Sequence, residues 1–228
     1  MAYRLIGTIV PTIMAYIQEQ KRIWYLWLYL LVLSMVECMV GLGYNEAGVT
    51  IHMVVLFFMY GCAAYYWKDD IHKLYLALSL VPLTRIINLA IPPFPLPSNF
   101  YCFLSGVPML VAACLVAQEN GLSFYKAFWG GERIIQVLGG YSLGVVMGLM
   151  NYLLLRPETL IPGYGNWPLL IVSFTVLIAS GFLEELLFRG ILYPTAVEAL
   201  DQQVGWLYSS LVYASLQISR LSALSVLL

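Results

Sequence analysis

Long apolar runs separated by short polar connections make up most of the chain. A helix needs about 20 consecutive, predominantly apolar residues to cross the hydrocarbon core of a bilayer. Runs of about this length lie at 23–40, 49–67, 74–91, 100–117, 134–155, 168–193 and 204–219. The pattern therefore predicts an all-α fold, a polytopic transmembrane helical bundle of about seven spans.

The segments outside these runs have different predicted roles. Four prolines in six positions exclude a helix at 92–97. The opening stretch 5–17 is shorter than a span and is broken by Pro11, so we predict a helix at the membrane interface rather than a cleaved signal peptide. Residues 121–133 mix aromatic with charged side chains, and we predict that they lie on the membrane surface before the fifth span.

The composition agrees with a membrane protein and excludes other classes. Hydrophobic side chains make up 61% of the 228 residues and charged ones 10%, whereas soluble domains carry roughly a quarter charged residues. The formal net charge is -1, so the chain has no basic field that could hold nucleic acid. The partner that we expect is therefore the lipid bilayer, and no nucleic acid.

Basic residues are distributed unevenly over the predicted connections. One side of the membrane would hold seven of them, Arg4, Lys21, Arg22, Lys68, Lys73, Lys126 and Arg133. The other side would hold Arg156 alone. Since connections rich in lysine and arginine stay in the cytoplasm, this predicts a multi-pass integral protein of the plasma membrane with its basic loops cytoplasmic.

Three charged residues stand together inside the sixth predicted span: Glu184, Glu185 and Arg189. A charged side chain near the bilayer centre costs about 2.5–3.5 kcal/mol, so we expect these groups to turn away from lipid and find partners. Glu185 and Arg189 are one helical turn apart and can pair. Glu184 is rotated from Glu185 by about 100°, which leaves it for chemistry as a general base or acid. A salt bridge that only packs the helix is the structural alternative.

The residues around these charges match a motif of a known protein family. The string Glu-Glu-Leu-Leu-Phe-Arg at 184–189 resembles the first motif, Glu-Glu-x-x-x-Arg, of the CAAX-protease and bacteriocin-processing family of intramembrane endopeptidases, which includes the Rce1-like enzymes. The second motif of that family is Phe-x-x-x-His on the next helix, and the corresponding positions here are Tyr213 and Gln217. The resemblance covers about 121–219. It implies an amino-terminal transmembrane region at 1–120 and a CAAX-protease-like core at 121–228.

The resemblance also implies an activity and a site. The expected protein is a membrane-embedded endopeptidase that hydrolyses a peptide bond of a membrane-associated peptide or protein by glutamate-activated water. By the match of motifs, Glu184, Glu185 and Arg189 are the catalytic residues, while Tyr213 and Gln217 line the site.

Gln217 is the main departure from the family pattern. Glutamine can donate and accept hydrogen bonds, but it cannot exchange a proton near neutral pH or bind zinc as imidazole does. The two histidines of the chain, His52 and His72, lie far upstream, so the later family motif with a further histidine has no counterpart. We therefore assign no cofactor: a divalent metal is implied for the family, but its histidine ligands are missing.

The same departure bears on activity. We expect little or no peptidase activity from residues 1–228, and a gain on Gln217→His only if a downstream segment is also restored. The chain ends in an apolar run at 221–228. A fragment that lacks its C-terminal helices and a degenerate homologue both remain open.

Three further ionisable residues lie inside predicted spans: Glu37, His52 and Arg85. We predict that Glu37 and Arg85 pair across helices, with His52 as a neighbouring hydrogen-bonding group, rather than forming a proton path. Three classes of function stay open at this point. They are an intramembrane endopeptidase, an inactive relative acting as a membrane scaffold or immunity factor, and a small transporter or channel subunit.

Overall fold

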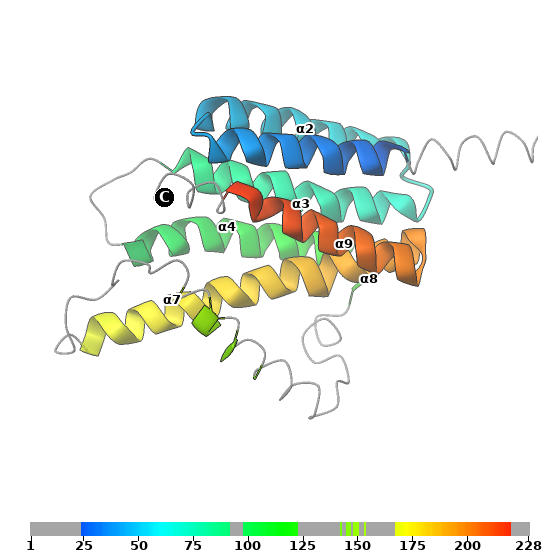
Figure 1. Cartoon of the computed structure of the whole chain (residues 1–228). Helices are drawn as coiled ribbons and strands as arrows, with labels where there is room; N and C mark the ends of the chain where they lie inside the picture. The colour runs from blue at the N-terminus through cyan, green and yellow to red at the C-terminus, as the bar shows by residue number, and fades with distance from the viewer. Residues whose placement is uncertain are drawn as a thin grey trace, which may run out of the picture.

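The computed structural model describes residues 24–91, 98–122 and 167–219, together with the isolated positions 142, 145–146, 148–150 and 153. Within these ranges all regular secondary structure is helical, which confirms the predicted all-α class (Figure 1). The predicted interfacial helix at 5–17 and most of the predicted surface segment and fifth span lie outside the described residues.

The described helices agree with six of the predicted spans. The first helix is Trp24–Gly41, and it is followed by α2 (Asn45–Tyr65), α3 (Ile71–Ala90) and α4 (Ser98–Glu119). The carboxyl-terminal part consists of α7 (Trp167–Glu185), the π-helix η1 (Leu186–Leu192), α8 (Tyr193–Leu200) and α9 (Gln202–Leu216). Among the described residues, three helices are long and apolar enough to cross a membrane: the first helix, α2 and α3.

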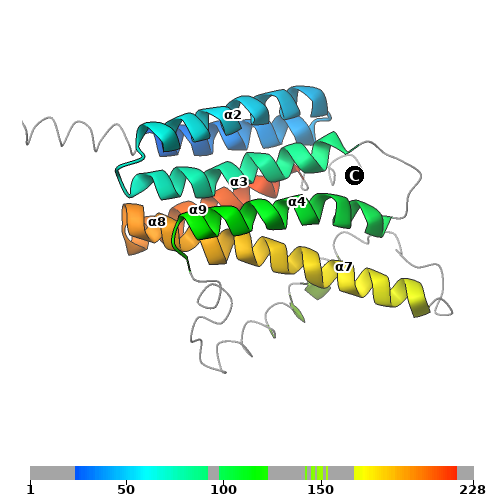
Figure 2. The ribbon, with the colours of Figure 1, turned by 180° about the vertical axis from the view of Figure 1, so that it is seen from behind.

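Helix α3 lies at the centre of the bundle. The first helix and α2 lie on one side of it, and α4 and α7 lie on the other (Figures 1 and 2). Pro82 interrupts the backbone ladder of α3, because proline has no N–H to donate to the carbonyl of Leu78. The hydroxyl of Tyr29 on the first helix donates to this carbonyl instead, at 3.0 Å. The break in α3 thereby becomes a point of attachment for the first helix.

Helix α9 returns along the helix that precedes it. The chain reverses at Asp201, which has a positive φ of 104° and whose carboxylate accepts hydrogen bonds from the N–H groups of Gln203 and Val204. At Gly205 the two helices touch: a side-chain carbon added there would lie 2.6 Å from the backbone nitrogen of Val197. This tight hairpin directs α9 back past η1 towards the end of α7.

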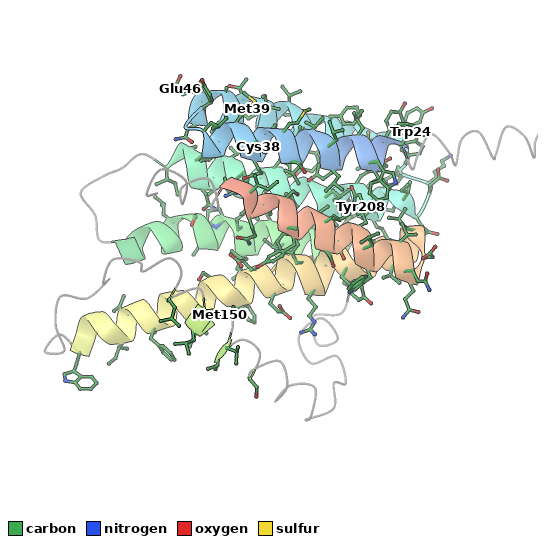
Figure 3. All side chains as sticks on the ribbon, in the orientation of Figure 1. Trp24, Cys38, Met39, Glu46, Met150 and Tyr208 are labelled. Atoms are coloured by element: carbon green, nitrogen blue, oxygen red, sulfur yellow. The ribbon has the colours of Figure 1, made fainter. Side chains whose placement is uncertain are left out.

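The core is apolar and joins all the described helices. Tyr208 of α9 is buried in it and points towards the first helix, where its hydroxyl donates to the carbonyl of Leu26 at 3.0 Å (Figure 3). Fully buried side chains from the other helices include Leu33, Met59, Leu74, Leu78, Met109, Leu186 and Ile191.

The outer surface is also apolar. Trp24 is 72% exposed at one end of the first helix, and Phe57 of α2 is 72% exposed. Soluble monomers rarely expose large contiguous apolar patches. The surface therefore suits lipid rather than water.

Candidate active site

Glu184 stands where the sixth predicted span changes its helical form. It lies in the last turn of α7, and the π-helix η1 begins two residues later. Helices of the π type are rare, occur mostly as short bulges and frequently mark functional sites. The sequence analysis predicted one helical span at 168–193 and did not predict this change of helical form.

Glu184 lines a cavity of about 70 Å³ between α3, η1 and α9. The side chains of Tyr213 and Gln217, from the end of α9, line the same cavity. The structure thus brings the glutamate of the first motif and both residues of the second motif to one space. The hairpin at Asp201 explains this placement, because residues about equally far before and after the reversal come together.

Aromatic packing holds η1 against α9 beside this cavity. The rings of Phe188 and Tyr213 meet edge to face, with their centroids 4.9 Å apart. Gln217 follows the last residue of α9 and is half-buried. Its position is therefore fixed by the end of the helix rather than by a loop.

The second glutamate of the motif points elsewhere. Arg189 donates to Glu185 at 2.7 Å, which confirms the predicted pairing one turn apart. The two side chains are, however, 63% and 60% exposed, so the expectation that all three charges turn inward is met by Glu184 only. Successive residues of a helix are rotated by about 100°, which prevents Glu184 and Glu185 from facing the same cavity.

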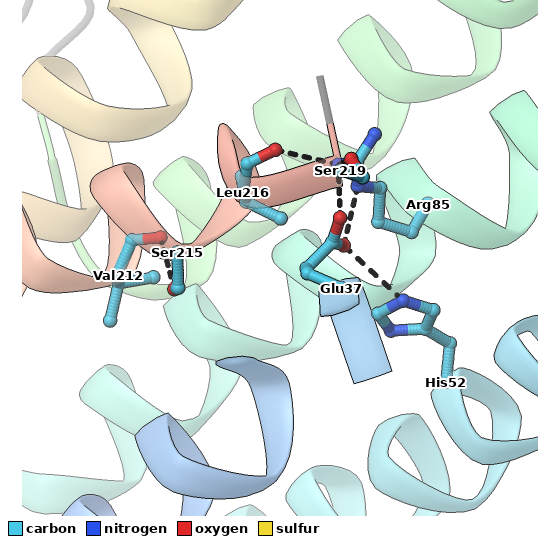
Figure 4. Close-up of polar contacts among 7 residues, drawn as sticks. All are labelled: Glu37, His52, Arg85, Val212, Ser215, Leu216 and Ser219. Carbon is cyan, nitrogen blue, oxygen red and sulfur yellow. Dashed lines mark hydrogen bonds and ion pairs between the residues drawn. The ribbon is translucent and has the colours of Figure 1, made fainter. Parts of the chain in front are cut away.

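A buried ionic cluster adjoins the cavity (Figure 4). Arg85 of α3 donates two hydrogen bonds to the carboxylate of Glu37 on the first helix, one from Nε at 2.6 Å and one from Nη2. This confirms the predicted pair. Nη2 also donates to the carbonyl of Leu216 at 2.7 Å and to the hydroxyl of Ser219 at 2.6 Å. Behind Glu37, Nε2 of the fully buried His52 lies 3.4 Å from the carboxylate.

Arg85 also lines the cavity of Glu184, which the sequence analysis did not predict. Together with Asn88 and Thr84 it forms a polar stripe on α3, and all three line the cavity of Glu184. The signal was present in the sequence, since positions three and four apart share one face of a helix. What was missing was knowledge that α3 packs against η1.

A larger and mostly apolar cavity of about 410 Å³ lies on the other side of Glu184, between α3, α4 and α7. Glu184, Thr84, Asn88 and Leu187 line both cavities. The larger space has the size of a small-ligand pocket, which is about 300–1,000 Å³. Glu184 therefore lies between a small cavity, which Arg85 and Gln217 also line, and a larger one.

The described residues do not fit the divalent metal implied by the family. No group of three or more histidine, cysteine, aspartate or glutamate side chains that could hold a metal ion occurs among them. The polar residues that line the cavity are one carboxylate, Glu184, the amides Asn88 and Gln217, the hydroxyl residues Thr84 and Tyr213, and the guanidinium of Arg85. A guanidinium repels a metal cation and supplies no electron pair, so we derive no step through a metal.

The fold indicates an integral membrane protein, since the described part of the chain contains three candidate spans and its helices enclose the cavity. In the comparison with known families, residues 166–228 match the model of the type II CAAX prenyl endopeptidase family, Rce1-like. This confirms the predicted family resemblance for that part of the chain, which contains both motifs. The match lies within the predicted core at 121–228, and the boundary at 120 stays a prediction. No curated protein and no solved structure matched the chain.

Proposed function

We propose that this protein is a membrane-embedded endopeptidase of the CAAX-processing type in which Glu184 activates the attacking water. The observation that carries the proposal is the placement of Glu184 opposite Gln217 on one cavity. The family match of residues 166–228 supports the reaction class. The substrate is a membrane-associated peptide or protein.

The cavity has the size and the groups that hydrolysis requires. A space of about 70 Å³ holds a few water molecules, since one water needs about 10–15 Å³ by this measure. The Glu184 carboxylate takes a proton from one water while the water oxygen attacks the peptide carbonyl carbon. The C–N bond then breaks, its electron pair goes to nitrogen, and the proton moves from Glu184 to that nitrogen. The amide of Gln217 orients the water or the carbonyl by hydrogen bonding.

The other motif residues act on the geometry. Glu185 and Arg189 form a pair within the turn that carries Glu184, and we assign them the role of holding that turn. Tyr213 lines the cavity and packs on Phe188, so it fixes the distance between η1 and α9. None of these three residues needs to touch the reacting atoms.

A second candidate function is an inactive relative that binds peptides as a membrane scaffold or immunity factor. The observation that favours it is Gln217 in place of the family histidine, with no histidine in the sequence after His72. In that case the cavity would bind a peptide and leave it intact. The orientation that we propose, in the plasma membrane with Lys68 and Lys73 on the cytoplasmic side, is common to both functions.

Hydrolysis by the purified full chain in liposomes separates the two candidates. The probes are two quenched fluorescent peptides, one with a prenylated cysteine before its last three residues and one anchored by an acyl chain. We expect slow cleavage by the wild-type chain and a loss of about 10²-fold or more for Glu184→Gln, the range of general acid–base catalysis. Glu46→Gln, an exposed glutamate at the start of α2, is the matched control.

Equal cleavage by the wild type and Glu184→Gln would contradict the role of Glu184. Binding of both probes without cleavage by the wild type would favour the scaffold.

A further inference from the structure

Arg85 presents an unused hydrogen-bond donor beside the cavity of Glu184. Two of its three side-chain nitrogens, Nε and Nη2, make all of the hydrogen bonds that this side chain forms within the described part of the chain. The third nitrogen, Nη1, makes none there and points away from Glu37 in Figure 4. Arg85 lines the same cavity as Glu184 and Gln217, and its side chain keeps 15% exposure. A positively charged donor is therefore available at the wall of the site.

The guanidinium is held rigidly from the side opposite Nη1. Glu37 binds it through two parallel hydrogen bonds, and such bidentate pairs fix the plane of the group. The carbonyl of Leu216 and the hydroxyl of Ser219 hold the same edge, so the end of α9 is attached to Arg85. His52 packs behind the Glu37 carboxylate and is fully buried. A donor fixed before the reaction needs no reorganisation when charge develops.

We propose that Arg85 is a catalytic residue that stabilises the oxyanion of the tetrahedral intermediate through its Nη1 donor; this inference rests on the endopeptidase function proposed above. When the water oxygen bonds to the carbonyl carbon, the π electron pair of the C=O group moves onto its oxygen. Nη1–H donates to that oxygen. When the intermediate collapses, the pair returns to form C=O, and the C–N bond breaks as described for Glu184. Arg85 neither gains nor loses a proton.

The chemistry of the site favours Arg85 for this task over the other polar groups. Gln217 is a neutral donor, and charge-assisted hydrogen bonds are roughly twice as strong as neutral ones. Asn88 is exposed and also neutral. The guanidinium keeps its charge at all relevant pH values, whereas the histidine that the family carries has no counterpart at position 217. Arg85 thus supplies from α3 the positive charge that α9 lacks.

The test removes the pair without leaving a buried unpaired charge. The double variant Glu37→Met/Arg85→Met replaces both partners by apolar side chains, an exchange that proteins often tolerate in stability. Its control is Lys73→Met/Glu198→Met. This variant removes another ion pair between α3 and a carboxyl-terminal helix, in which Nζ of Lys73 lies 3.0 Å from the Glu198 carboxylate, away from the cavity. We measure kcat and KM with the prenylated and the acylated probe peptides. We expect kcat of the Glu37/Arg85 variant to fall by about 10²–10³-fold with KM little changed, and the control to match the wild type.

A folded double variant whose kcat stays within about tenfold of the wild type would overturn the role of Arg85. If Glu184→Gln is inactive in the same assay, the endopeptidase function stands and the inference about Arg85 alone fails. A wild type without activity, or a Glu184→Gln variant as active as the wild type, overturns both.

A second experiment, with a different variant, tests the proposal if the double variant does not fold. Arg85→Lys keeps the charge opposite Glu37 but loses the forked geometry. We expect it to bind a phosphinate analogue of the tetrahedral intermediate about tenfold or more weakly while binding the uncleaved acylated peptide as the wild type does. An equal loss for both ligands, or no loss for either, overturns the proposal.

Discussion

Two glutamate–arginine pairs of the same chemistry occupy opposite environments in this protein. Glu37 and Arg85 come from helices far apart in the sequence, and the Glu37 side chain is fully buried. Glu185 and Arg189 are neighbours on one helix, and both side chains are more than half exposed. A buried pair is hard to break because each partner alone would be an uncompensated charge. The buried pair thus lies outside the motif that carries the family resemblance, and the pair inside the motif is exposed.

The largest expected effect comes from breaking the buried pair on one side only. Arg85→Gln leaves the Glu37 carboxylate buried without its cation, so we expect the free energy of unfolding to fall by about 3–5 kcal/mol. Denaturant titration of the purified chain in mixed micelles measures it. A decrease of less than about 1 kcal/mol would show that the Glu37 carboxylate reaches water and that the pair does not hold the guanidinium in place.

The next largest effect concerns the hairpin that brings α9 to both the cavity and Arg85. In Gly205→Ala the added carbon would collide with the backbone of Ala196 and Val197, so we expect a loss of about 1–3 kcal/mol. Gly61→Ala in α2 is the control, since nothing lies within 4 Å of its added carbon. The same titration measures both variants, and equal stability of the two would contradict the close approach.

The exposed pair gives the smallest expected effect on stability. Glu185→Gln removes one partner of a helical pair one turn apart, and exposed pairs contribute up to about 1 kcal/mol. We expect its loss of unfolding free energy to lie well below that of Arg85→Gln. A loss as large as that of Arg85→Gln would show that lipid or protein covers Glu185 and Arg189 and would remove the contrast between the pairs.

The sequence predicted those features that depend on local spacing or on the need to pair a charge in an apolar span. The helix positions and the Glu185–Arg189 contact follow from periodicity, and the Glu37–Arg85 contact follows from the cost of an unpaired charge. The π-helix at Leu186–Leu192 has no hydrophobic periodicity of its own and was not predicted. The shared cavity of Arg85 and Glu184 depends on packing between helices about 100 residues apart, which a single sequence does not encode locally.

The most direct test of Glu184 as the catalytic base compares the two adjacent glutamates in one hydrolysis assay. Glu184 lines the cavity, whereas Glu185 points outward to Arg189. With the prenylated and acylated probe peptides in liposomes, we expect Glu184→Gln to lower kcat by about 10²-fold or more and Glu185→Gln to lower it by less than about tenfold. Equal losses for the two variants, or a larger loss for Glu185→Gln, would contradict the assignment of the catalytic base.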